Sequence, residues 1–495
     1  MTLLSNSTVP FGHHDQLFIG GKWIKASSDT TFDVIAPGTE EVYVRVAEAQ
    51  EADVEKAVAA ARDAFDRGPW PRMSPAERAG YMRAIAKGLN ERAEEVAITW
   101  PNEMGILHSV AQSFAGGMGG IFEYYAGLAD TFPFEERHHP QAGGALGLLV
   151  REPVGVVAAI IPWNAPINLM ANKLAPALLA GCTVIIKSSP EAPSAGYMMA
   201  EIVEAAGLPP GVINFITADR DVSEKLVRHP GVDKISFTGS TLAGRKIAAI
   251  CGDRIARYTL ELGGKSAAVV LDDYDLEAAA DALVGPTCLM SGQVCSSLTR
   301  IIVTRNRHDD LLDALSARFG AVTVGDPFDS ATGIGPIAMR RQRDRIEKLI
   351  EMGVSEGATL AVGGKRPAHL NRGFFIEPTV FGNVDNNSTL AREEIFGPVV
   401  SVIAADSEAH AVQLANDTIY GLNNSVFTND ADRAYKIARE LRSGTVGHNH
   451  FRTDFSIAFG GFKQSGVGRE GGVEGLLPYL EAKTVILEGK PSHIV

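Results

Sequence analysis

Apolar positions recur at helical spacing in the first part of the chain. In Val54–Phe65 and Pro75–Trp100 they return every three or four residues, with Ala, Glu, Arg and Lys between them, which is typical of amphipathic helices. Phe18–Trp23 carries two glycines between apolar residues and predicts a β-hairpin. We therefore expect the N-terminal segment, up to Trp100, to form mainly helical cover.

From Val154 onward, short apolar runs alternate with helical stretches. The runs that resemble strands are Val154–Ile161, Thr183–Lys187, Val212–Ile216 and Lys234–Phe237. Helical spacing lies between or after them in Lys173–Ala180, Ala195–Ala206 and Leu242–Ile250. This alternation predicts right-handed βαβ units, a parallel sheet covered on both faces, and a doubly wound nucleotide-binding domain.

A second alternating series, between Gly263 and about Gly460, predicts a second α/β domain. Its expected strands are Ser266–Leu271, Ile301–Thr304, Phe375–Val380, Val399–Ala404 and Ser425–Thr428. Two more strand-like segments, Gln141–Arg151 and Tyr479–Leu487, lack a helix partner. They could pair with each other or with another subunit.

Composition narrows the class of protein. A chain of 495 residues, 45% of them hydrophobic, can bury a large interior and is long enough for several domains. The net charge of −13, with no block of Lys or Arg, argues against nucleic acid or a membrane surface as partner. Met1–Pro10 lacks the features of a secretory signal, and no apolar run approaches bilayer length. We expect a soluble cytoplasmic protein.

One of the four cysteines has the surroundings of a nucleophile. Their spacing forms no Cys-x-x-Cys pair or zinc-finger pattern, so we expect neither a disulfide framework nor a metal site. By default each is a small buried hydrophobe. Cys295, however, ends a small polar turn, Gly-Gln-Val-Cys, where a thiol could be exposed. A nucleophile there needs a nearby base or a positive dipole, because the thiolate is the reactive form.

Three other segments have two interpretations each on local grounds. A Gly-x-x-x-x-Gly turn from Gly239 leads into a predicted helix. Its glycines could place helix N–H groups around an anion, or they could only allow a tight turn. The turn matches neither a Walker A loop nor the dinucleotide fingerprint. Glu261, before two glycines, could be the base or an ordinary solvated carboxylate. Asn164, at a strand's carboxyl end, could donate to an oxyanion or serve only as a turn residue.

Together, these segments resemble the aldehyde dehydrogenase family in identity, order and spacing over essentially the whole chain. The matching motifs are Phe-Ile-Gly-Gly-x-Trp at Phe18, Pro-Trp-Asn at Pro162, Thr-Gly-Ser-x-x-x-Gly at Thr238, Glu-Leu-Gly-Gly-Lys at Glu261, Gly-Gln-x-Cys ending in Cys295, Glu-Glu-Ile-Phe-Gly-Pro at Glu393, Asn-x-x-x-Tyr-Gly-Leu at Asn416, and Phe-Gly-Gly-x-Lys-x-Ser-Gly-x-Gly-Arg-Glu at Phe459. One such motif arises easily by chance, whereas the series in family order does not.

The resemblance implies an α/β fold with three parts. These are a doubly wound, Rossmann-like NAD(P)-binding domain (1–129 and 152–262), an α/β catalytic domain (263–463) and a small β oligomerisation element (130–151 and 475–495). It further implies a homodimer or homotetramer that binds a small-molecule aldehyde. We expect NAD as the better cofactor, with measurable use of NADP.

The resemblance also assigns roles to single residues. Cys295 is the implied nucleophile, Glu261 the general base and Asn164 an oxyanion donor beside the Cys295 N–H, while Glu470 matches a second carboxylate on the proton's way out. The implied cofactor-binding residues are Lys187 at the adenosine ribose, Gly239 and Ser240 at the pyrophosphate, Glu394 at the nicotinamide ribose, and Ile160, Pro162, Trp163, Leu262 and Phe396, with Phe459 as the nicotinamide-side wall.

These roles predict oxidation through a thiohemiacetal and a thioester on the cysteine, followed by hydrolysis. Coenzyme-A-acylating relatives typically lack the base, so Glu261 favours water as the acyl acceptor. A cysteine hydrolase would need a histidine partner, and the nearest candidates, His448 and His450, we interpret as packing or surface residues. A catalytically silent structural protein would be expected to have lost Cys295 or Glu261.

Three departures from the family pattern matter. Pro190 stands where a ribose-binding Glu is common, although Glu191 follows and could swing in, and Ala458 replaces a usual Pro. Ala165 stands where a large aromatic is common, and Asn168, Leu169 and Asn172 follow on the same predicted helix. We therefore expect a wide pocket for bulky or apolar aldehydes, unless Phe451 or Phe455 refills the space.

Overall fold

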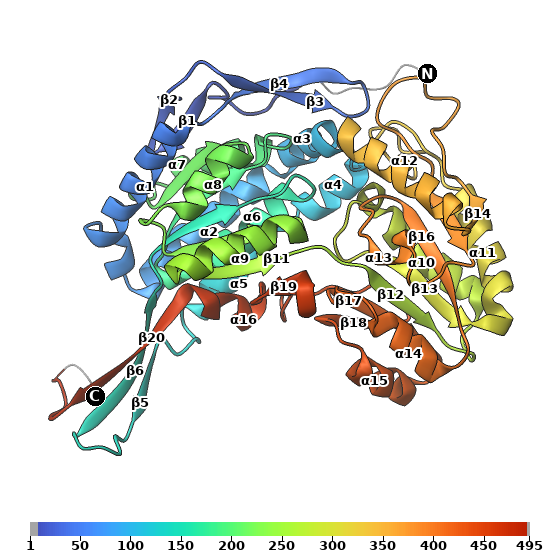
Figure 1. Ribbon diagram of the computed structural model, residues 1–495. Helices are drawn as coiled ribbons and strands as arrows, with labels where there is room; N and C mark the ends of the chain where they lie inside the picture. Colours follow the sequence, from blue (N-terminus) through green and yellow to red (C-terminus); the bar gives the residue numbers. More distant parts are fainter. Residues whose placement is uncertain (1–7, 493–495) are drawn as a thin grey trace.

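The computed structural model describes residues 8–492. Residues 1–7 of the predicted 1–129 segment and residues 493–495 of the predicted 475–495 segment lie outside this range. Two α/β halves stand side by side, and an arm of strands projects from the first (Figure 1). This architecture confirms the predicted fold class, while the exact domain bounds stay a prediction.

The first half is built on an eight-stranded sheet. Its order is β19 (Gly466–Val467), β11 (Arg257–Glu261), β10 (Lys234–Thr238), β7 (Val156–Ile160), β8 (Thr183–Ser188), β9 (Ile213–Thr217), β1 (Gln16–Ile19) and β2 (Lys22–Lys25). The five central strands are parallel, and β7 to β10 are fully buried, which explains their near-continuous apolar runs. Strand order reverses at β7, where doubly wound sheets bind ligands.

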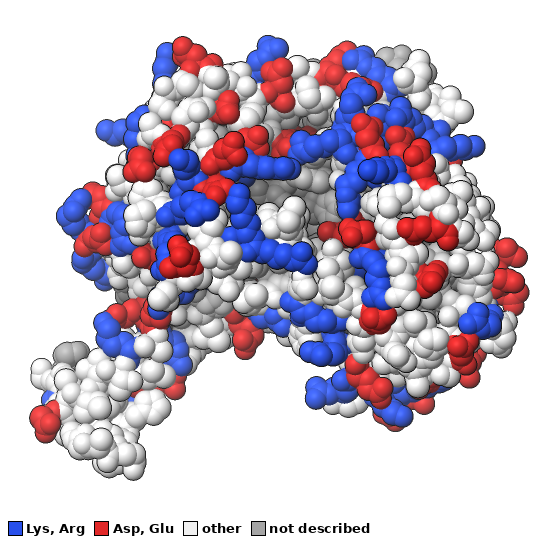
Figure 2. Space-filling view, in the orientation of Figure 1, with Lys and Arg blue, Asp and Glu red and all other residues white. Residues whose placement is uncertain are grey.

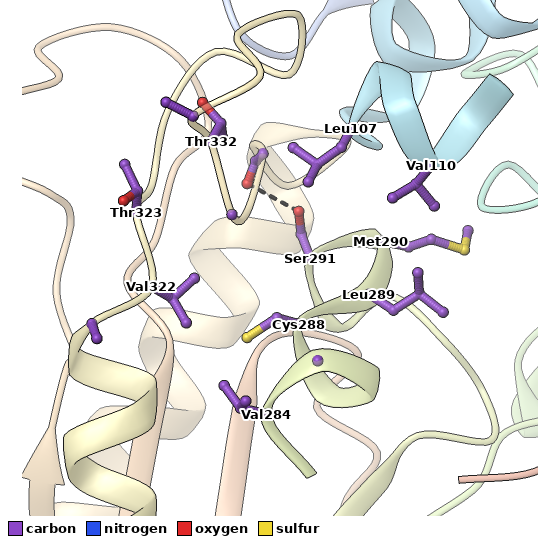
Figure 3. A pocket seen from close by; sticks show the side chains of 15 residues that line it. Leu107, Val110, Val284, Cys288, Leu289, Met290, Ser291, Val322, Thr323 and Thr332 are labelled. Atoms are coloured by element: carbon purple, nitrogen blue, oxygen red, sulfur yellow. Dashed lines mark hydrogen bonds between the residues drawn. The ribbon is translucent and has the colours of Figure 1, made fainter. Parts of the chain in front are cut away.

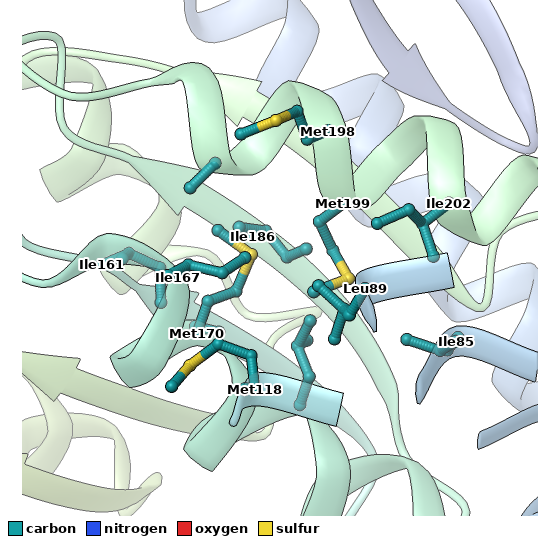
Figure 4. Packing of buried hydrophobic residues seen from close by; sticks show 14 of the residues in the cluster. Ile85, Leu89, Met118, Ile161, Ile167, Met170, Ile186, Met198, Met199 and Ile202 are labelled. Carbon is teal, nitrogen blue, oxygen red and sulfur yellow. The ribbon is translucent and has the colours of Figure 1, made fainter. Parts of the chain in front are cut away.

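Helices cover both faces of this sheet. One face carries α1 (Glu51–Asp66), α8 (Arg220–Arg228) and α9 (Thr241–Arg254); the other carries α2 (Pro75–Glu91), α5 (Met118–Leu128), α6 (Pro166–Ala180) and α7 (Ser194–Ala205), with α3 (Ala93–Met104) and α4 (His108–Ala115) beside them. Figure 4 shows the second face, where Leu89, Met170 and Met199 from three helices meet Ile186 of β8. This interior fixes the start of α6, which follows the predicted oxyanion donor.

The second half is built on a seven-stranded sheet. Its order is β14 (Thr359–Val362), β15 (Thr379–Gly382), β16 (Val399–Ala405), β13 (Leu298–Thr304), β12 (Ser266–Val270), β17 (Asn423–Phe427) and β18 (Thr445–His448), all parallel except β14. The accompanying helices are α10 (Leu276–Cys288), α11 (His308–Gly320), α12 (Arg340–Ser355), α13 (Thr389–Arg392), α14 (Glu408–Asn416) and α15 (Ala431–Glu440).

The projecting arm is a three-stranded antiparallel sheet. β6 (Leu146–Pro153) lies between β5 (Glu135–His138) and β20 (Leu480–Leu487), in a register that pairs Leu146 with Leu487. The two strand-like segments without helices therefore pair with each other. Helix α16 (Gly472–Leu476) leads the chain from the first half into the arm.

Several predicted elements were wrong in extent. The strand expected at Phe375–Val380 begins only at Thr379, because Pro378 has no N–H to donate to a ladder. The helix expected at Lys173–Ala180 begins at Pro166, where proline suits the first turn. A hairpin, β3 (Thr31–Ala36) and β4 (Glu41–Ala47), was not expected among the N-terminal helices.

The unexpected β3–β4 hairpin links the two halves. It runs along the top of the molecule in Figure 1 toward the second half. There the Phe374 N–H donates to Pro37 O at 2.9 Å, and the Gly373 N–H donates to the Glu40 carboxylate at 2.9 Å. Within residues 8–492, no helix combines the length and apolarity needed to cross a membrane.

Candidate active site

Predicted site residues lie at or next to the carboxyl ends of four neighbouring strands of the first sheet. Ile160, the last residue of β7, pairs with Lys187 of β8 on one side and with Phe237 of β10 on the other. Thr238 of β10 in turn pairs with Glu261, the last residue of β11. Because carboxyl ends of parallel strands share one edge, these residues form one row at the edge where such sheets bind ligands.

Cys295 differs from the other three cysteines in its exposure. Cys182, Cys251 and Cys288 are buried, whereas Cys295 is half-buried. It follows a tight turn in which Met290 and Ser291 have φ of 52° and 57°, a left-handed conformation that side-chain-bearing residues rarely adopt. The Ser291 hydroxyl donates to Gly335 O at 2.9 Å, which holds this turn within the second half. The thiol is thus presented on a fixed loop rather than packed in a core.

The buried side chain of Gln293 fixes the turn by hydrogen bonds, a role that was not predicted from the sequence. Its amide donates to Met290 O at 3.0 Å and accepts from the Ala338 N–H at 2.9 Å, and the side chain is fully buried. A buried amide with both ends bonded fixes its backbone strongly. Its place two residues before Cys295 was the only signal that could have identified it.

Asn164 is held against the same turn. Its side-chain amide donates to Gln293 O at 3.0 Å, and its own carbonyl accepts from the Trp100 indole N–H at 2.9 Å. An amide nitrogen has two hydrogens, so one donor of Asn164 is still available beside the nucleophile turn. This position suits an oxyanion donor.

Glu261 is a buried carboxylate without a committed partner. Its side chain is 2% exposed, and neither oxygen has a hydrogen-bond partner among the residues that the structure describes. Burial raises the pKa of Glu261 well above its usual value, and Glu470 raises it further, while Lys173 and Arg469 act in the opposite direction. A buried carboxyl group with a raised pKa is suited to accept a proton.

Close approaches at two glycines bring the motifs together. A Cβ on Gly264 would lie 2.2 Å from the carbonyl oxygen of Cys295, so the nucleophile's backbone packs directly on the Gly-Gly segment after Glu261. A Cβ on Gly460 would lie 2.8 Å from Glu261 Oε1, which puts the Phe-Gly-Gly motif against the carboxylate. Any larger side chain at either position would collide with these groups.

A buried ion pair lies behind Glu261. Lys173 of α6 pairs with Glu470, and its ammonium also donates to the Thr238 hydroxyl at 2.8 Å; both charged side chains are at most 2% exposed. The backbone of Glu470 is in turn bonded to Phe459, with N···O distances of 2.6 and 2.7 Å. Lys173 was not among the predicted site residues, although a single lysine within an apolar helix was a usable signal.

The surroundings of the Cys295 thiol disfavour its ionised form. Burial raises its pKa, the carboxylates of Glu394 and Glu261 raise it further, and the backbone N–H groups of Cys295 and Ser296 oppose them. Because the thiolate is the nucleophile, removal of the thiol proton requires a base or a change in the surroundings. Both carboxylates that interact with the thiol belong to the predicted site.

Predicted cofactor residues from the two halves meet beside this centre. Trp163 and Phe396 make an edge-to-face contact with ring centroids 5.3 Å apart. Glu394 accepts from the Gly264 N–H at 3.1 Å, and burial raises the pKa of Glu394 to about 7. Phe459 is buried and stacks on Phe455 at 4.3 Å. The remaining predicted contacts, Pro162 and Leu262, are half-buried and buried where β7 and β11 end.

The other predicted cofactor residues present positive charge and helix N–H groups. Ser240 caps α9, and its hydroxyl accepts from the Ala243 N–H at 3.3 Å, just after Gly239. The start of a helix suits an anion. Burial lowers the pKa of Lys187 to about 8, while Glu191 and Asp219 oppose this shift. Figure 2 shows the molecule hollowed between its halves, with Lys and Arg along the hollow. These residues fit a dinucleotide with a pyrophosphate.

A hollow of about 370 Å³ with apolar and small polar walls lies beside the nucleophile turn, and Cys295, Glu261 and Asn164 are not among the residues that line it. Figure 3 shows Leu289 and Met290 from this turn together with Leu107 and Val110 from the start of α4, and Val322 across the space. Its size falls within the range of small-molecule pockets. Apolar side chains thus adjoin the segment that carries Cys295.

Comparison with known proteins identifies the family. The aldehyde dehydrogenase family model matches residues 23–485. The chain belongs to the aldehyde dehydrogenase family. It is 44% identical to a protein named geranial dehydrogenase from Castellaniella defragrans, across 96% of this chain and 99% of that protein.

Solved structures of other aldehyde dehydrogenases have the same fold. One, from Mycobacterium tuberculosis and complexed with NAD⁺, is 43% identical with a TM-score of 0.93, covering 96% of this chain and 98% of that one. Another is a cysteine variant of aldehyde dehydrogenase C from Pseudomonas syringae, complexed with NAD⁺ and octanal. It is 37% identical with a TM-score of 0.92, and covers 98% of this chain and 100% of that one. The resemblance predicted from the sequence motifs is therefore confirmed.

Proposed function

We propose that this aldehyde dehydrogenase oxidises apolar aldehydes to carboxylic acids with NAD⁺, through a thioester on Cys295. One observation carries the proposal: the half-buried Cys295 thiol interacts with the Glu261 carboxylate, which has no hydrogen-bond partner within residues 8–492, and the amide of Asn164 is bonded to the same turn with one hydrogen to spare. Family membership and the NAD⁺ complexes of similar structures support it.

In the first step the Cys295 thiol gives its proton to the Glu261 carboxylate, and the sulfur adds to the aldehyde carbon. Glu261 passes this proton on by way of Glu470 before hydrolysis begins. An aldehyde does not release a hydride readily, because its carbonyl carbon holds no negative charge to expel it. The new C–S bond pushes an electron pair onto the carbonyl oxygen. Asn164 and the Cys295 N–H donate hydrogen bonds to this oxyanion, and one such donor typically contributes about 3 kcal/mol.

The second step is hydrolysis of the thioester. NAD⁺, when bound, supplies the hydride acceptor for the oxidation that turns the adduct into a thioester. Glu261 then takes a proton from water while the water oxygen attacks the acyl carbon. The C–S bond breaks, the carboxylic acid leaves, and the Cys295 sulfur is restored. Glu470, which interacts electrostatically with Glu261, would carry the proton onward.

Two features support apolar aldehydes as substrates. Ala165, at the start of α6, packs on the same apolar cluster as Leu289 of the nucleophile turn, whereas Phe451 packs on a different cluster. One similar protein is named geranial dehydrogenase, and another, aldehyde dehydrogenase C, has been solved in complex with octanal.

The four free cysteines are compatible with the predicted cytoplasmic location.

The direct test compares two alanine variants of cysteines. We expect Cys295→Ala to oxidise hexanal at less than about a thousandth of the parent rate, because loss of a nucleophile has this order of cost. Cys251→Ala, a change of a fully buried cysteine in α9, should keep the rate. The absorbance of reduced cofactor measures both. A substantial rate for Cys295→Ala would refute the covalent mechanism.

A further inference from the structure

One ion pair joins the two halves next to the predicted adenosine site. The Arg341 guanidinium, in the first turn of α12, donates to one oxygen of Glu191. The other oxygen of Glu191 accepts from the Ser189 hydroxyl. Glu191 follows β8 and interacts electrostatically with Lys187 of that strand. The pair therefore connects the catalytic half to the residues that would bind the adenosine ribose.

The geometry separates an inner carboxylate from an outer cation. The Glu191 side chain is 22% exposed, whereas the Arg341 side chain is 61% exposed. Burial raises the pKa of Glu191, but the hydrogen bonds from Ser189 and Arg341 outweigh it and hold the pKa below its usual value. Glu191 is thus a fixed anion, one residue beyond Pro190.

The proposed mechanism assigns no role to Arg341. Arg340, one residue earlier on α12, is similarly exposed at 59% but pairs with Glu40 of the β3–β4 segment. Of these two adjacent arginines, only Arg341 contacts the residues after β8. An arginine with one carboxylate partner still has free N–H donors, and a guanidinium binds phosphate well.

We propose that Arg341 is a specificity-determining residue for the cofactor: it holds Glu191 at the adenosine ribose and supplies the cation that lets the same site accept a 2′-phosphate. The proposal rests on the proposed use of a nicotinamide dinucleotide. With NAD, the fixed Glu191 carboxylate accepts hydrogen bonds from the ribose hydroxyls. With NADP, Glu191 repels the 2′-phosphate, while Arg341 and Lys187 attract it. NAD is therefore preferred and NADP is tolerated.

The roles of the two charges predict opposite effects on NADP. Arg341→Ala removes the attraction of the 2′-phosphate by Arg341 and leaves its repulsion by Glu191. The Kd for NADP should therefore rise about tenfold, as expected for one lost charge-assisted hydrogen bond. The Kd for NAD should change by less than about threefold. Glu191→Gln keeps the shape and removes the repulsion, so NADP should bind about tenfold more tightly. Glu191→Gln with Arg341→Ala should lose most of that gain.

Calorimetric titration of NAD and NADP without aldehyde provides the test. Arg340→Ala is the matched control, and its affinities for both cofactors should equal those of the parent. The inference is overturned if Arg341→Ala leaves both affinities unchanged or weakens both equally, which would make the pair a simple bridge between the halves. Because no turnover is measured, this result is independent of whether the enzyme oxidises aldehydes.

Discussion

At the scale of single residues, the motifs identified the reacting groups but not the groups that position them. Cys295, Glu261 and Asn164 stand in short local patterns, so the sequence predicts them. Lys173 and Gln293 act through partners far along the chain, such as Glu470 and Ala338. Local patterns carry no information on such pairs, because tertiary packing alone creates them.

The pH dependence of hydrolysis reports on Glu261. The base acts when deprotonated, and its pKa is raised, so decay of the acyl-enzyme should slow as pH falls through that raised value. Glu470→Gln removes one cause of the shift, so the acid limb of the pH–rate profile should move to lower pH. Decay of a preformed thioester across pH measures it.

The control for this experiment is Glu474→Gln, which changes an exposed glutamate four residues farther on. Its acid limb should coincide with that of the parent. An unchanged limb in Glu470→Gln, or a shift toward higher pH, would show that Glu470 does not act on the base.

At the scale of elements, the alternation of runs predicted the central strands well and the peripheral ones poorly. Buried parallel strands are continuous apolar runs, which the sequence displays directly. The β3–β4 hairpin mixes buried positions with half-buried and exposed ones, so it lacks the fully buried runs that mark the central strands. The start of α6 was hidden by polar Asn168 and Asn172, whose side chains hydrogen-bond to each other within the helix.

The arm predicts an oligomer, because β5 and β20 are its edges and neither pairs further within residues 8–492. We expect light scattering to give a dimer or tetramer of the 52.7 kDa chain. Ile486→Glu, in β20, should shift the mass distribution toward smaller species by placing a charge on an exposed apolar side chain.

Val354→Glu is the matched control for this change, because the two side chains are 50% and 53% exposed while Val354 lies at the end of α12. It should leave the mass unchanged. A parent protein that scatters as a stable monomer would rule out the predicted oligomer.

At the scale of the whole molecule, the site exists only where the two halves meet. Asn164 and Glu261 belong to the first half, and Cys295 and Glu394 to the second. The change of pattern near Gly263 predicts two halves, but no local pattern specifies how they dock. One motif glycine, Gly460, lies at this junction, where a Cβ would come within 2.8 Å of Glu261 Oε1.

The space around Ala165 predicts the dependence on aldehyde size. From acetaldehyde to hexanal, kcat/KM should rise about fourfold per added methylene, the effect of burying ~0.8 kcal/mol of apolar surface. Ala165→Phe should flatten this trend by filling the space. Ala59→Phe, an exposed position on α1, serves as the control. A flat series in the parent, or an unchanged series in Ala165→Phe, would contradict the wide pocket.

The most direct test of the covalent account is intact-mass analysis of Glu261→Gln after exposure to hexanal and NAD⁺. Glutamine preserves the shape but cannot accept the proton from water, so hydrolysis should slow and the thioester should accumulate. The covalent mechanism predicts a mass increase equal to one hexanoyl group, located on Cys295 by peptide mapping. A normal steady-state rate without an adduct, or an acyl group on another cysteine, would contradict it.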